Sequence, residues 1–373
     1  MLNCFKSVAM KKLSVLIVVI FCLFTFLKAQ TMRVANNNPG AAMGTNVYTG
    51  TNALEDAIAN SVAGDIIYVV PSSTGYGNND ININIPLTIF GVGILPSKDI
   101  GTKSVIDVNC FQCDLNLNAS NIRLSGLIID GNVLLGFDLS STTVSNITIE
   151  NCRLGRIEMG SSNGVDVNNL LVRNNVIEGY GSLATSLLLY ITANVTITNN
   201  IIFTSCCTAA SLRITGATIS YNTFISDGNR GIDADLQNNI FDHNIFYGTN
   251  VNLQATTNNN VWTNNLSFGA TNMIFGEGAG SNGAISGNIE DSDPMFTNVP
   301  ITRTWSDSHD FTLLTGSPAL AINNGTGTDI GPSGGATPFD AEGNLLPLIQ
   351  SITVPSVIPV GTDLPVNIKA KGN

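Results

Sequence analysis

The sequence has few basic residues and almost no histidine. It contains 16 Lys and Arg against 27 Asp and Glu among 373 residues, and two histidines, His243 and His309. A nucleic-acid-binding surface needs clustered Lys and Arg to neutralise phosphates, so nucleic acid is not expected as a partner. Neither histidine lies at the spacing from a cysteine that a structural zinc site requires, which argues against a zinc protein.

Cysteines that could form a regular disulfide framework are also lacking. Two of the seven, Cys4 and Cys22, precede residue 30, which leaves Cys110, Cys113, Cys152, Cys206 and Cys207. Because five is an odd number, at least one thiol is unpaired. Cys152 occupies a repeat position that predicts a small buried residue, whereas Cys110 and Cys113 are placed for a local disulfide after export.

Residues 1–29 have the pattern of a signal peptide. Lys11 and Lys12 precede an apolar run of 15 residues from Leu13 to Leu27, and Ala29 offers a small residue for cleavage before Gln30. The run is short for a membrane anchor. Whether translation starts at Met1 or Met10, we expect a secreted protein, located outside the cell, on its surface or in the periplasm. Cleavage would leave 12 basic and 27 acidic residues, a net charge of −15.

One short phrase recurs along the chain. Two alternating apolar residues are followed by an asparagine and, after it, by another apolar residue, as in VTITNNII (195–202) and ATISYNTF (217–224). The phrase returns every 21 to 25 residues, and Leu127 and Val92 continue its register towards the N-terminus. Alignment of the copies places these residues in one column: Cys152, Asn175, Asn200, Asn222, Asn244, Asn265 and Asn288.

This period predicts a solenoid. Each copy alternates as a strand does, and stacking at about 4.8 Å gives neighbouring copies a common core and a ladder of backbone hydrogen bonds. The leucine-rich-repeat consensus is missing, no helical pattern lies between the strands, and charged residues make up only 12% of the chain. We therefore predict an all-β fold, a right-handed parallel β-helix, whose inward asparagines bond to each other and to the turn backbone.

The expected organisation has five parts. A signal peptide (1–29) precedes an N-terminal segment (30–63) with a capping helix, in which Asn52 and Glu55 have the spacing of a capping box. The β-helix follows (64–300), beginning at GDIIYVV, and then a C-terminal cap (301–345). The last part (346–373) is a short Pro-containing tail: a linker, a docked strand pair or the start of a longer product.

The arrangement resembles the secreted bacterial right-handed β-helix repeat proteins of the pectin-lyase-like superfamily. The resemblance rests on the entry helix followed by GDIIYV, the NN-x-I coils, and the closing segment DPMF, DFTLL, GSPAL and DIG, and it covers residues 36–335. It implies the fold and export, but the superfamily includes lyases, hydrolases and proteins without known catalysis. The NTD segment, paired aspartates, GHG histidine and RIK segment of polygalacturonases are absent, and His243 is expected to line a turn or point outward.

Candidate functional residues follow from a second set of strand-like segments, which includes GFDLS, RIEMG, SLRIT, GIDADL and NVNLQ. If Phe137, Ile157 and their counterparts point inward, the alternating residues form an outward column. That column is Asp138, Glu158, Leu188, Arg213, Asp233 and Asn252, with Tyr190 and Asp235 in the next column and Arg230 in the preceding turn.

Two mechanisms fit this patch. In β-elimination of a uronate polymer, Asp233 and Asp235 hold calcium and Arg213 abstracts the proton. Hydrolysis would instead use Asp233 and Asp235 as a carboxyl pair about 6.6 Å apart, near the lower limit for inversion. The same residues also fit a solvated face or a binding groove without catalysis.

The sequence thus favours an exported monomer that binds or acts on a polysaccharide or cell-surface glycan along this face, as a uronate lyase rather than a hydrolase. Glu158, Tyr190, Asp138, Asn252 and Arg230 are the expected substrate contacts. The alternative is a structural or adhesive surface protein, for which a flat Asn/Thr/Ser face would be typical.

Overall fold

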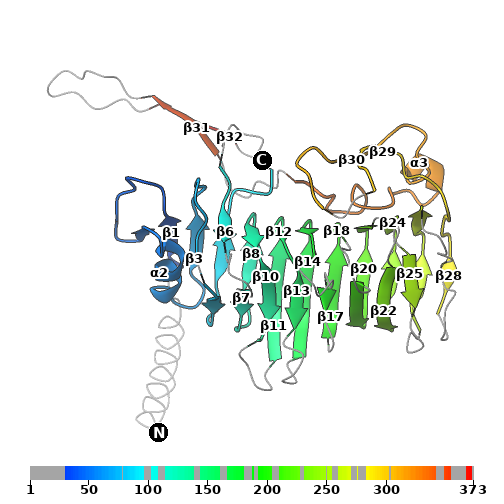
Figure 1. The fold of residues 1–373 in the computed structure, drawn as a ribbon, viewed down its shortest axis with the longest axis horizontal. Coiled ribbons are helices and arrows are strands. Elements are labelled where there is room, and N and C mark those ends of the chain that lie inside the picture. The colour runs from blue at the N-terminus through cyan, green and yellow to red at the C-terminus, as the bar shows by residue number, and fades with distance from the viewer. Residues whose placement is uncertain are drawn as a thin grey trace, which may run out of the picture.

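The fold is seen in a computed structural model, which confirms the predicted all-β right-handed parallel β-helix (Figure 1). From β5 to β25 each coil runs through three sheets in turn, and within each sheet the strands of neighbouring coils pair in parallel. The structure describes residues 30–77, 79–95, 102–107, 114–137, 143–159, 166–179, 187–188, 192–203, 210–226, 231–248, 250–253, 259–269, 275, 283–301, 304–341, 348–353 and 367–371.

The three sheets are numbered in the order in which each coil visits them. Sheet 1 consists of β2 (Val47–Thr49), β1 (Met32–Asn36), β3 (Ile66–Val69), β5 (Thr88–Phe90), β8 (Arg123–Ser125), β11 (Thr143–Glu150), β14 (Asp166–Arg173), β17 (Thr192–Thr198), β20 (Ala217–Ser220), β23 (Ile240–Asp242), β26 (Val261–Thr263) and β28 (Ile285–Ser286). Sheet 2 consists of β6 (Val105–Asp107), β9 (Ile128–Asp130), β12 (Arg153–Leu154), β15 (Val176–Ile177), β18 (Ile201–Phe203), β21 (Thr223–Ile225), β24 (Ile245–Tyr247) and β27 (Leu266–Phe268). Sheet 3 consists of β4 (Ile81–Ile83), β7 (Asp114–Leu117), β10 (Asn132–Leu135), β13 (Ile157–Met159), β16 (Leu187–Leu188), β19 (Ala210–Thr215), β22 (Gly231–Gln237) and β25 (Asn250–Leu253).

The predicted asparagine ladder is present at the corner between sheets 1 and 2. The backbone N–H and the Nδ2 of Asn200 both donate to Oδ1 of Asn222, at 3.0 and 2.9 Å, and Nδ2 also donates to the carbonyl of Val172 in the preceding coil at 2.9 Å. The same pattern repeats along the column, where all but Asn288 are fully buried: Asn175, Asn200, Asn222, Asn244, Asn265 and Asn288. Each ladder asparagine thereby satisfies polar groups of the coil before its own.

Cys152 begins this ladder, as predicted. It is fully buried with a free thiol, its N–H donates to Oδ1 of Asn175 at 2.9 Å, and burial raises the pKa of the thiol to about 12. The other predicted thiols, Cys110, Cys113, Cys206 and Cys207, lie outside the described residues, as does the predicted signal peptide.

Residues with positive φ, in the left-handed region of backbone conformation, lie at both ends of the straight part of the sheet 1 strands. The first column is Asn121, Asn146, Asn169, Asn194, Gly216, Asn238 and Asn259, and the second, five residues later in each coil, is Gly126, Asn151, Asn174, Asn199, Tyr221, His243 and Asn264. Asn and Gly tolerate positive φ best among the residues. Only Tyr221 and His243 depart from that preference, with φ of 57° and 55°.

The N-terminal end of the solenoid is covered by helix α2 (Ala53–Ala59), which buries Leu54 and Ala57. The predicted capping box is wrong, because Asn52 is the N-cap but its side chain makes no capping hydrogen bond. Instead its carbonyl accepts from the N–H of Asp56 at 2.8 Å. Sheet 1 also begins earlier than the predicted first coil, since β1 pairs with β3.

At the other end the core closes with aromatic rings. Phe241 and Trp262 stack with ring centroids 4.1 Å apart, and Phe275 packs across Trp262 and Phe246 at 6.1 and 5.7 Å. The N–H of Phe275 donates to Oε1 of Glu290 at 3.0 Å. Phe275 therefore shields the last coil, as an open solenoid end requires.

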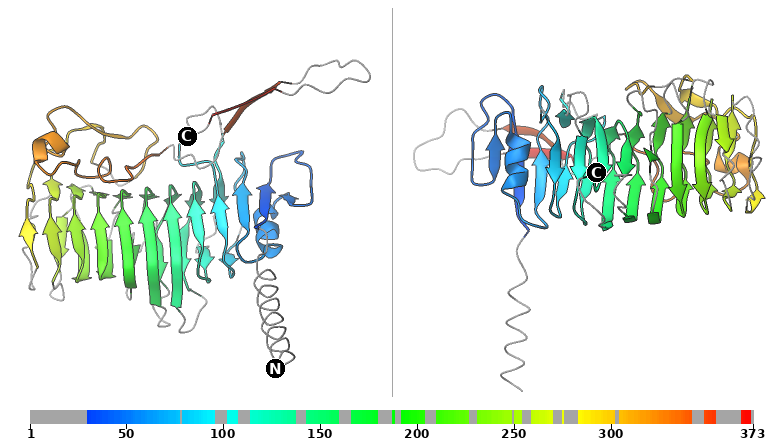
Figure 2. Two further views of the ribbon diagram at one scale, coloured as in Figure 1. Left: turned by 180° about the vertical axis from the view of Figure 1, so that it is seen from behind. Right: turned by 60° about the horizontal axis from the view of Figure 1, so that its bottom comes forward.

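The segment after the last coil lies along the outward face of sheet 2 (Figure 2). We call residues 291–341 the strap; it includes the antiparallel pair β29 (Phe296–Asn298) and β30 (Asp310–Leu313) and the short helix α3 (Ala321–Asn324). A second hydrophobic core, separate from the solenoid core, joins Ile94 and sheet 2 residues to strap residues: Val176, Ile201, Phe203, Ile225, Ile245, Tyr247, Leu266, Phe296, Val299, Trp305, Phe311, Ala319 and Ile330. Residues 301–345, expected as a C-terminal cap, thus belong largely to a side-packed element.

The tail contains an antiparallel strand pair, β31 (Leu348–Thr353) with β32 (Asn367–Lys371). Within the described part of the chain, no helix has the length and apolarity needed to cross a membrane.

We predict that Asn200→Leu destabilises the fold more than Thr196→Val, an outward change on the same strand. The leucine removes the amide and leaves its buried carbonyl and N–H partners without a hydrogen bond, at about 1–3 kcal/mol for each such group. Chemical denaturation of both variants measures the difference. Equal midpoints would show that the ladder contributes little to stability.

Candidate functional site

The strand pairing in sheet 3 differs from the register predicted for the patch of candidate residues. Arg213 pairs with Leu188 on one side and with Asp235 on the other, whereas Asp233 pairs with Ser211 and Asn252. Asp235, rather than Asp233, is therefore level with Arg213. The strands β19, β22 and β25 still bring these residues to neighbouring positions of one sheet, as expected.

The first part of the predicted column is wrong. The sheet 3 strand of that coil is Asn132–Leu135, not GFDLS, and Leu134 is the residue that pairs with Glu158. Phe137, predicted to point inward, is 51% exposed. Three further predicted site residues, Asp138, Tyr190 and Arg230, lie outside the described residues.

Glu158 is the one predicted contact whose side chain is described. It is half-buried on β13, and its Oε2 lies 2.8 Å from Nη2 of Arg156. Burial raises the pKa of the Glu158 carboxyl, the nearby Arg156 lowers it and Asp114 raises it, with a net upward shift. Ile157 and Met159 on either side are buried, as the alternation predicts.

A cleft that the sequence does not predict lies between the strap and the edge of the solenoid. We call this cavity of about 880 Å³ the strap cleft. Its aromatic lining comes from the strap: Trp305, His309, Phe311 and Phe339. Among the described residues, its charged lining adds Lys103 of the solenoid to four carboxylates of the strap: Asp307, Asp310, Asp329 and Asp340.

The aromatic wall is held in place by ring packing. Trp305 and Phe311 are parallel within 2° at a centroid separation of 6.2 Å, and Phe339 meets Trp305 edge-on at 6.4 Å. Trp305 and Phe311 are each only 8% exposed, but Phe339 and His309 are half-buried. The cleft thus presents two ring faces to solvent over a packed base.

A chain of charged contacts fixes the strap beside the cleft. Nζ of Lys103 lies 2.7 Å from Oδ2 of Asp307, whose Oδ1 accepts from Nε1 of Trp305 at 3.0 Å. The N–H of Trp305 donates to Oε1 of buried Glu178, and Nε of Arg153 donates to Oε2 of the same carboxylate at 2.7 Å. Through these contacts the strap joins Lys103 just before β6, Arg153 on β12 and Glu178 just after β15.

The protonation states follow from these contacts. Burial of the Asp307 carboxyl works to raise its pKa, but the hydrogen bonds from Lys103 and Trp305 outweigh it and lower the pKa below the usual range. Burial lowers the pKa of His309, so the ring is neutral at pH 7. Its Nδ1 accepts from the N–H of Ser306 at 3.2 Å, which leaves the proton on Nε2 as a donor.

A smaller cavity of about 250 Å³ adjoins the cleft and shares Lys103 with it. It lies over β6, β9 and β12 and is lined by Val105, Ile128, Ile129, Asp130 and Arg153. Apart from Thr223, the outward residues of sheet 2 are apolar beneath the strap, whereas Asp107, Asp130 and Arg153 occupy this end of the sheet. The two cavities together mark the place where the strap leaves the sheet.

The glycine-rich part of the strap docks on the two unusual left-handed residues. The rings of Tyr221 and His243 stack at 5.0 Å, the N–H of Gly331 donates to the carbonyl of His243 at 2.8 Å, and a Cβ on Gly334 or Gly335 would lie 2.8 or 3.0 Å from the Tyr221 ring. Beside it, Nδ2 of Asn199 donates to the carbonyl of Gly334 at 2.8 Å. The strap therefore covers the positions where the Asn pattern is broken.

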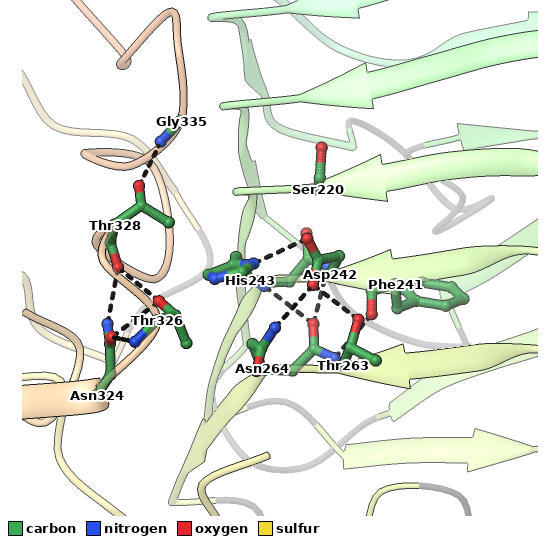
Figure 3. Close-up of polar contacts among 12 residues, drawn as sticks. Ser220, Phe241, Asp242, His243, Thr263, Asn264, Asn324, Thr326, Thr328 and Gly335 are labelled. Carbon is green, nitrogen blue, oxygen red and sulfur yellow. Dashed lines mark hydrogen bonds and ion pairs between the residues drawn. The ribbon is translucent and has the colours of Figure 1, made fainter. Parts of the chain in front are cut away.

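His243 also forms part of a polar cluster at the C-terminal ends of neighbouring sheet 1 strands (Figure 3). Its Nδ1 lies 2.8 Å from Oδ2 of Asp242, while Oδ1 of Asp242 accepts from Thr263 Oγ1 at 2.7 Å and Asn264 Nδ2 at 3.2 Å. Burial works to raise the pKa of Asp242, but His243, Thr263 and Asn264 together lower it. His243 is only 7% exposed and turn-lining, one of the two positions expected for it.

The residues of this region could be found from sequence only in part. Continuous apolar triplets such as IIF (201–203) and IFY (245–247) indicate a strand buried on both faces, and hence a cover over sheet 2. No pattern in the sequence says that residues near 305 supply that cover. Among the side chains that the structure describes, no group of three His, Cys, Asp or Glu is placed to bind a metal ion. The side chains of the proposed calcium ligands Asp233 and Asp235 lie outside the described ones.

No protein-family profile matches the sequence, and no curated protein matches it. Among solved structures, the chain is similar to the alginate lyase AlyGC of polysaccharide lyase family 6, with a TM-score of 0.28 and 14% sequence identity over 65% of this chain and 45% of that chain. The chain thus spans less than half the length of that protein. A likeness this distant says nothing of the activity, substrate or site of this protein.

We predict that Gly334→Ala loosens the strap. The added Cβ would lie 2.0 Å from the carbonyl oxygen of Asp329 as well as against Tyr221, so residues 328–335 must shift, at a cost of about 1–3 kcal/mol. Hydrogen exchange of these amides should accelerate while the ladder amides stay protected. The control is Ala336→Ser, an exposed neighbour; unchanged protection in Gly334→Ala would contradict the docking described above.

A second prediction concerns pH. Because the folded pKa of Asp307 is lowered, its stabilising contribution is present above the ordinary pKa of about 4 and is lost as pH falls through the lower, folded value. The protection of the Trp305 amide, its exchange rate compared with the intrinsic rate at the same pH, should therefore fall below about pH 4. Asp307→Asn should show faster exchange already at pH 7 and no further step of this kind on acidification. A variant with the wild-type pH profile would show that the Lys103 contact does not hold the strap.

Proposed function

We propose that this protein is exported and binds a polysaccharide, with the strap cleft as its main contact surface. The observation that carries the proposal is the combination, in one open cavity of about 880 Å³, of half-buried rings with exposed carboxylates. Sugars present both apolar C–H faces, which pack on rings, and hydroxyls, which donate to carboxylates. The cavity size lies within the range of ligand sites.

The groups are placed for this role. Phe339 and His309 offer ring surface, His309 Nε2 supplies a donor, and Asp310 and Asp340 are exposed acceptors. The adjoining cavity over β6, β9 and β12 extends the surface beyond Lys103, which suits a chain molecule better than a small ligand.

The sheet 3 patch remains our second proposed contact. Register supports it, because Arg213 is level with Asp235 and Asp233 lies beside Asn252. If this patch catalyses a reaction, we propose β-elimination rather than hydrolysis. Arg213 would act as the base, and Asp233 and Asp235 would bind calcium.

A structural or adhesive role is the competing function, and one observation favours it. The outward face of sheet 1 carries hydroxyl side chains level with one another on successive strands, Thr198, Ser220 and Thr263 among them, interrupted by Asp242. Such a regular polar face is typical of a spacer or a surface for self-association.

We predict that glycan-array screening of the purified protein finds a polysaccharide ligand, and that Phe339→Ala weakens its binding about tenfold. That factor corresponds to the loss of about 1–1.5 kcal/mol of ring packing. Ile322→Ala, which alters an 88% exposed residue away from the cleft, is the control and should bind as wild type.

The double variant Arg213→Ala/Asp233→Ala distinguishes the two surfaces. Lost binding in this variant, with Phe339→Ala unaffected, would place the ligand on sheet 3. Ultraviolet absorbance of unsaturated products tests for elimination. Absence of any glycan ligand would favour the spacer role.

A further inference from the structure

We infer that two copies of this protein associate face to face through the outward side of sheet 1, related by a two-fold axis that runs parallel to the strands. The inference does not depend on glycan binding, because the strap and its cleft lie on the sheet 2 side of the solenoid (Figures 1 and 2). It departs from the monomer expected from the sequence and gives the sheet 1 face a partner.

Six strands of sheet 1 present two outward columns of side chains. These strands, β11, β14, β17, β20, β23 and β26, pair in one continuous register and lie side by side with little twist (Figure 1). The first column is Thr148, Leu171, Thr196, Thr218, Ile240 and Val261, and the second is Glu150, Arg173, Thr198, Ser220, Asp242 and Thr263. Between β11 and β26 the face is about 24 Å long, at about 4.8 Å for each strand.

The first column is rich in methyl groups. Leu171, Ile240 and Val261 are aliphatic, and the other three members are threonines. Ile240 is 44% exposed, and Thr218 on the neighbouring strand is exposed as well. Covering this row would remove apolar surface from water, which favours association.

The second column carries opposite charges at two of its strands. Arg173 on β14 shares the carboxylate of Glu150 with Arg123, at 2.6 Å from Arg173 Nη2, so these two guanidinium groups share one carboxylate. The Arg173 side chain is 32% exposed. Three strands further on, Asp242 is 30% exposed and is ionised at neutral pH because its hydrogen bonds lower its pKa.

The two columns are self-complementary. A two-fold axis midway between β17 and β20 reverses the order of the strands but keeps each column opposite itself, as an isologous interface requires. Arg173 then faces Asp242 of the second copy, and Leu171 faces Ile240 of the second copy, each twice. The remaining opposed pairs are Thr196 with Thr218, Thr148 with Val261, Thr198 with Ser220, and Glu150 with Thr263.

The opposed pairs also fit in size and chemistry. Threonine and valine have nearly the same shape, and threonine and serine can exchange hydrogen bonds. Packed sheets lie about 10 Å apart, a gap that an arginine and an aspartate can span together. Because the face is small, we expect a weak dimer, with a dissociation constant of about micromolar or above.

The first test is analytical ultracentrifugation of the purified protein from micromolar to millimolar concentration. Ile240→Lys places a charge in the first column and should weaken the dimer about tenfold or more. Ile322→Lys makes the same exchange at an 88% exposed residue of the strap and should associate as wild type. A wild-type protein that stays monomeric throughout, or equal association of the two variants, would overturn the inference.

A mixing experiment tests the axis. Thr196→Lys and Thr218→Glu each bring like charges close to the axis when a variant pairs with itself, so each alone should associate more weakly than wild type. In an equal mixture the two introduced charges are opposed across the axis, and the mixed dimer should form about tenfold more tightly than either variant alone. A mixture that associates no more tightly than the single variants would overturn the proposed axis.

The other possible occupant of this face is a flat polysaccharide surface. A protein that stays monomeric but binds insoluble cellulose or chitin, with Ile240→Lys impaired and Phe339→Ala unimpaired, would assign the face to a glycan and overturn the dimer. A dimer in a protein for which the glycan array finds no ligand would support this inference while contradicting the function proposed for the strap cleft.

Discussion

The structure depends on the stacking of buried asparagines at one corner of each coil. A β-helix must turn sharply at every corner, and the turn exposes backbone amides to a core that offers them no water. Each ladder asparagine solves this for its neighbours, as Asn222 does by accepting both the N–H and the Nδ2 of Asn200 while donating to the carbonyl of Ile197. The same hydrogen-bond arrangement therefore repeats at successive corners of the solenoid, and no corner needs a different set of partners for its backbone amides.

Because the corners fix where each strand begins and ends, they also fix which side chains face outward. Apart from Thr223, the outward residues of sheet 2 are apolar from β15 to β27, and they would form an exposed stripe without the strap. The strap covers that stripe and departs from it where the outward residues become Asp107, Asp130 and Arg153. The cleft forms where the strap leaves the sheet, so the change from apolar to charged outward residues along sheet 2 determines its position.

Sequence reasoning succeeded where structure is local and periodic. The ladder column, from Cys152 to Asn265, and the inward residues Ile157 and Met159 all follow from alternation and spacing. It failed in sheet 3, where loops of variable length precede the strands: Phe137 is exposed because its coil forms the strand at Asn132–Leu135. The cleft was not predictable because Lys103 and Asp307 are 204 residues apart, and nothing periodic connects them.

The most informative positions are those where the repeat departs from its own rule. A left-handed Tyr221 and His243 are strained where Asn or Gly would not be, and such strain persists only where surroundings hold it. Here the surroundings are the strap glycines, which fit against the Tyr221 ring because they have no side chain. The bulky rings, together with the amide of Asn199 in the same column, give the strap a surface to dock on. The coils that break the pattern thus hold the strap, and the strap in turn forms the cleft.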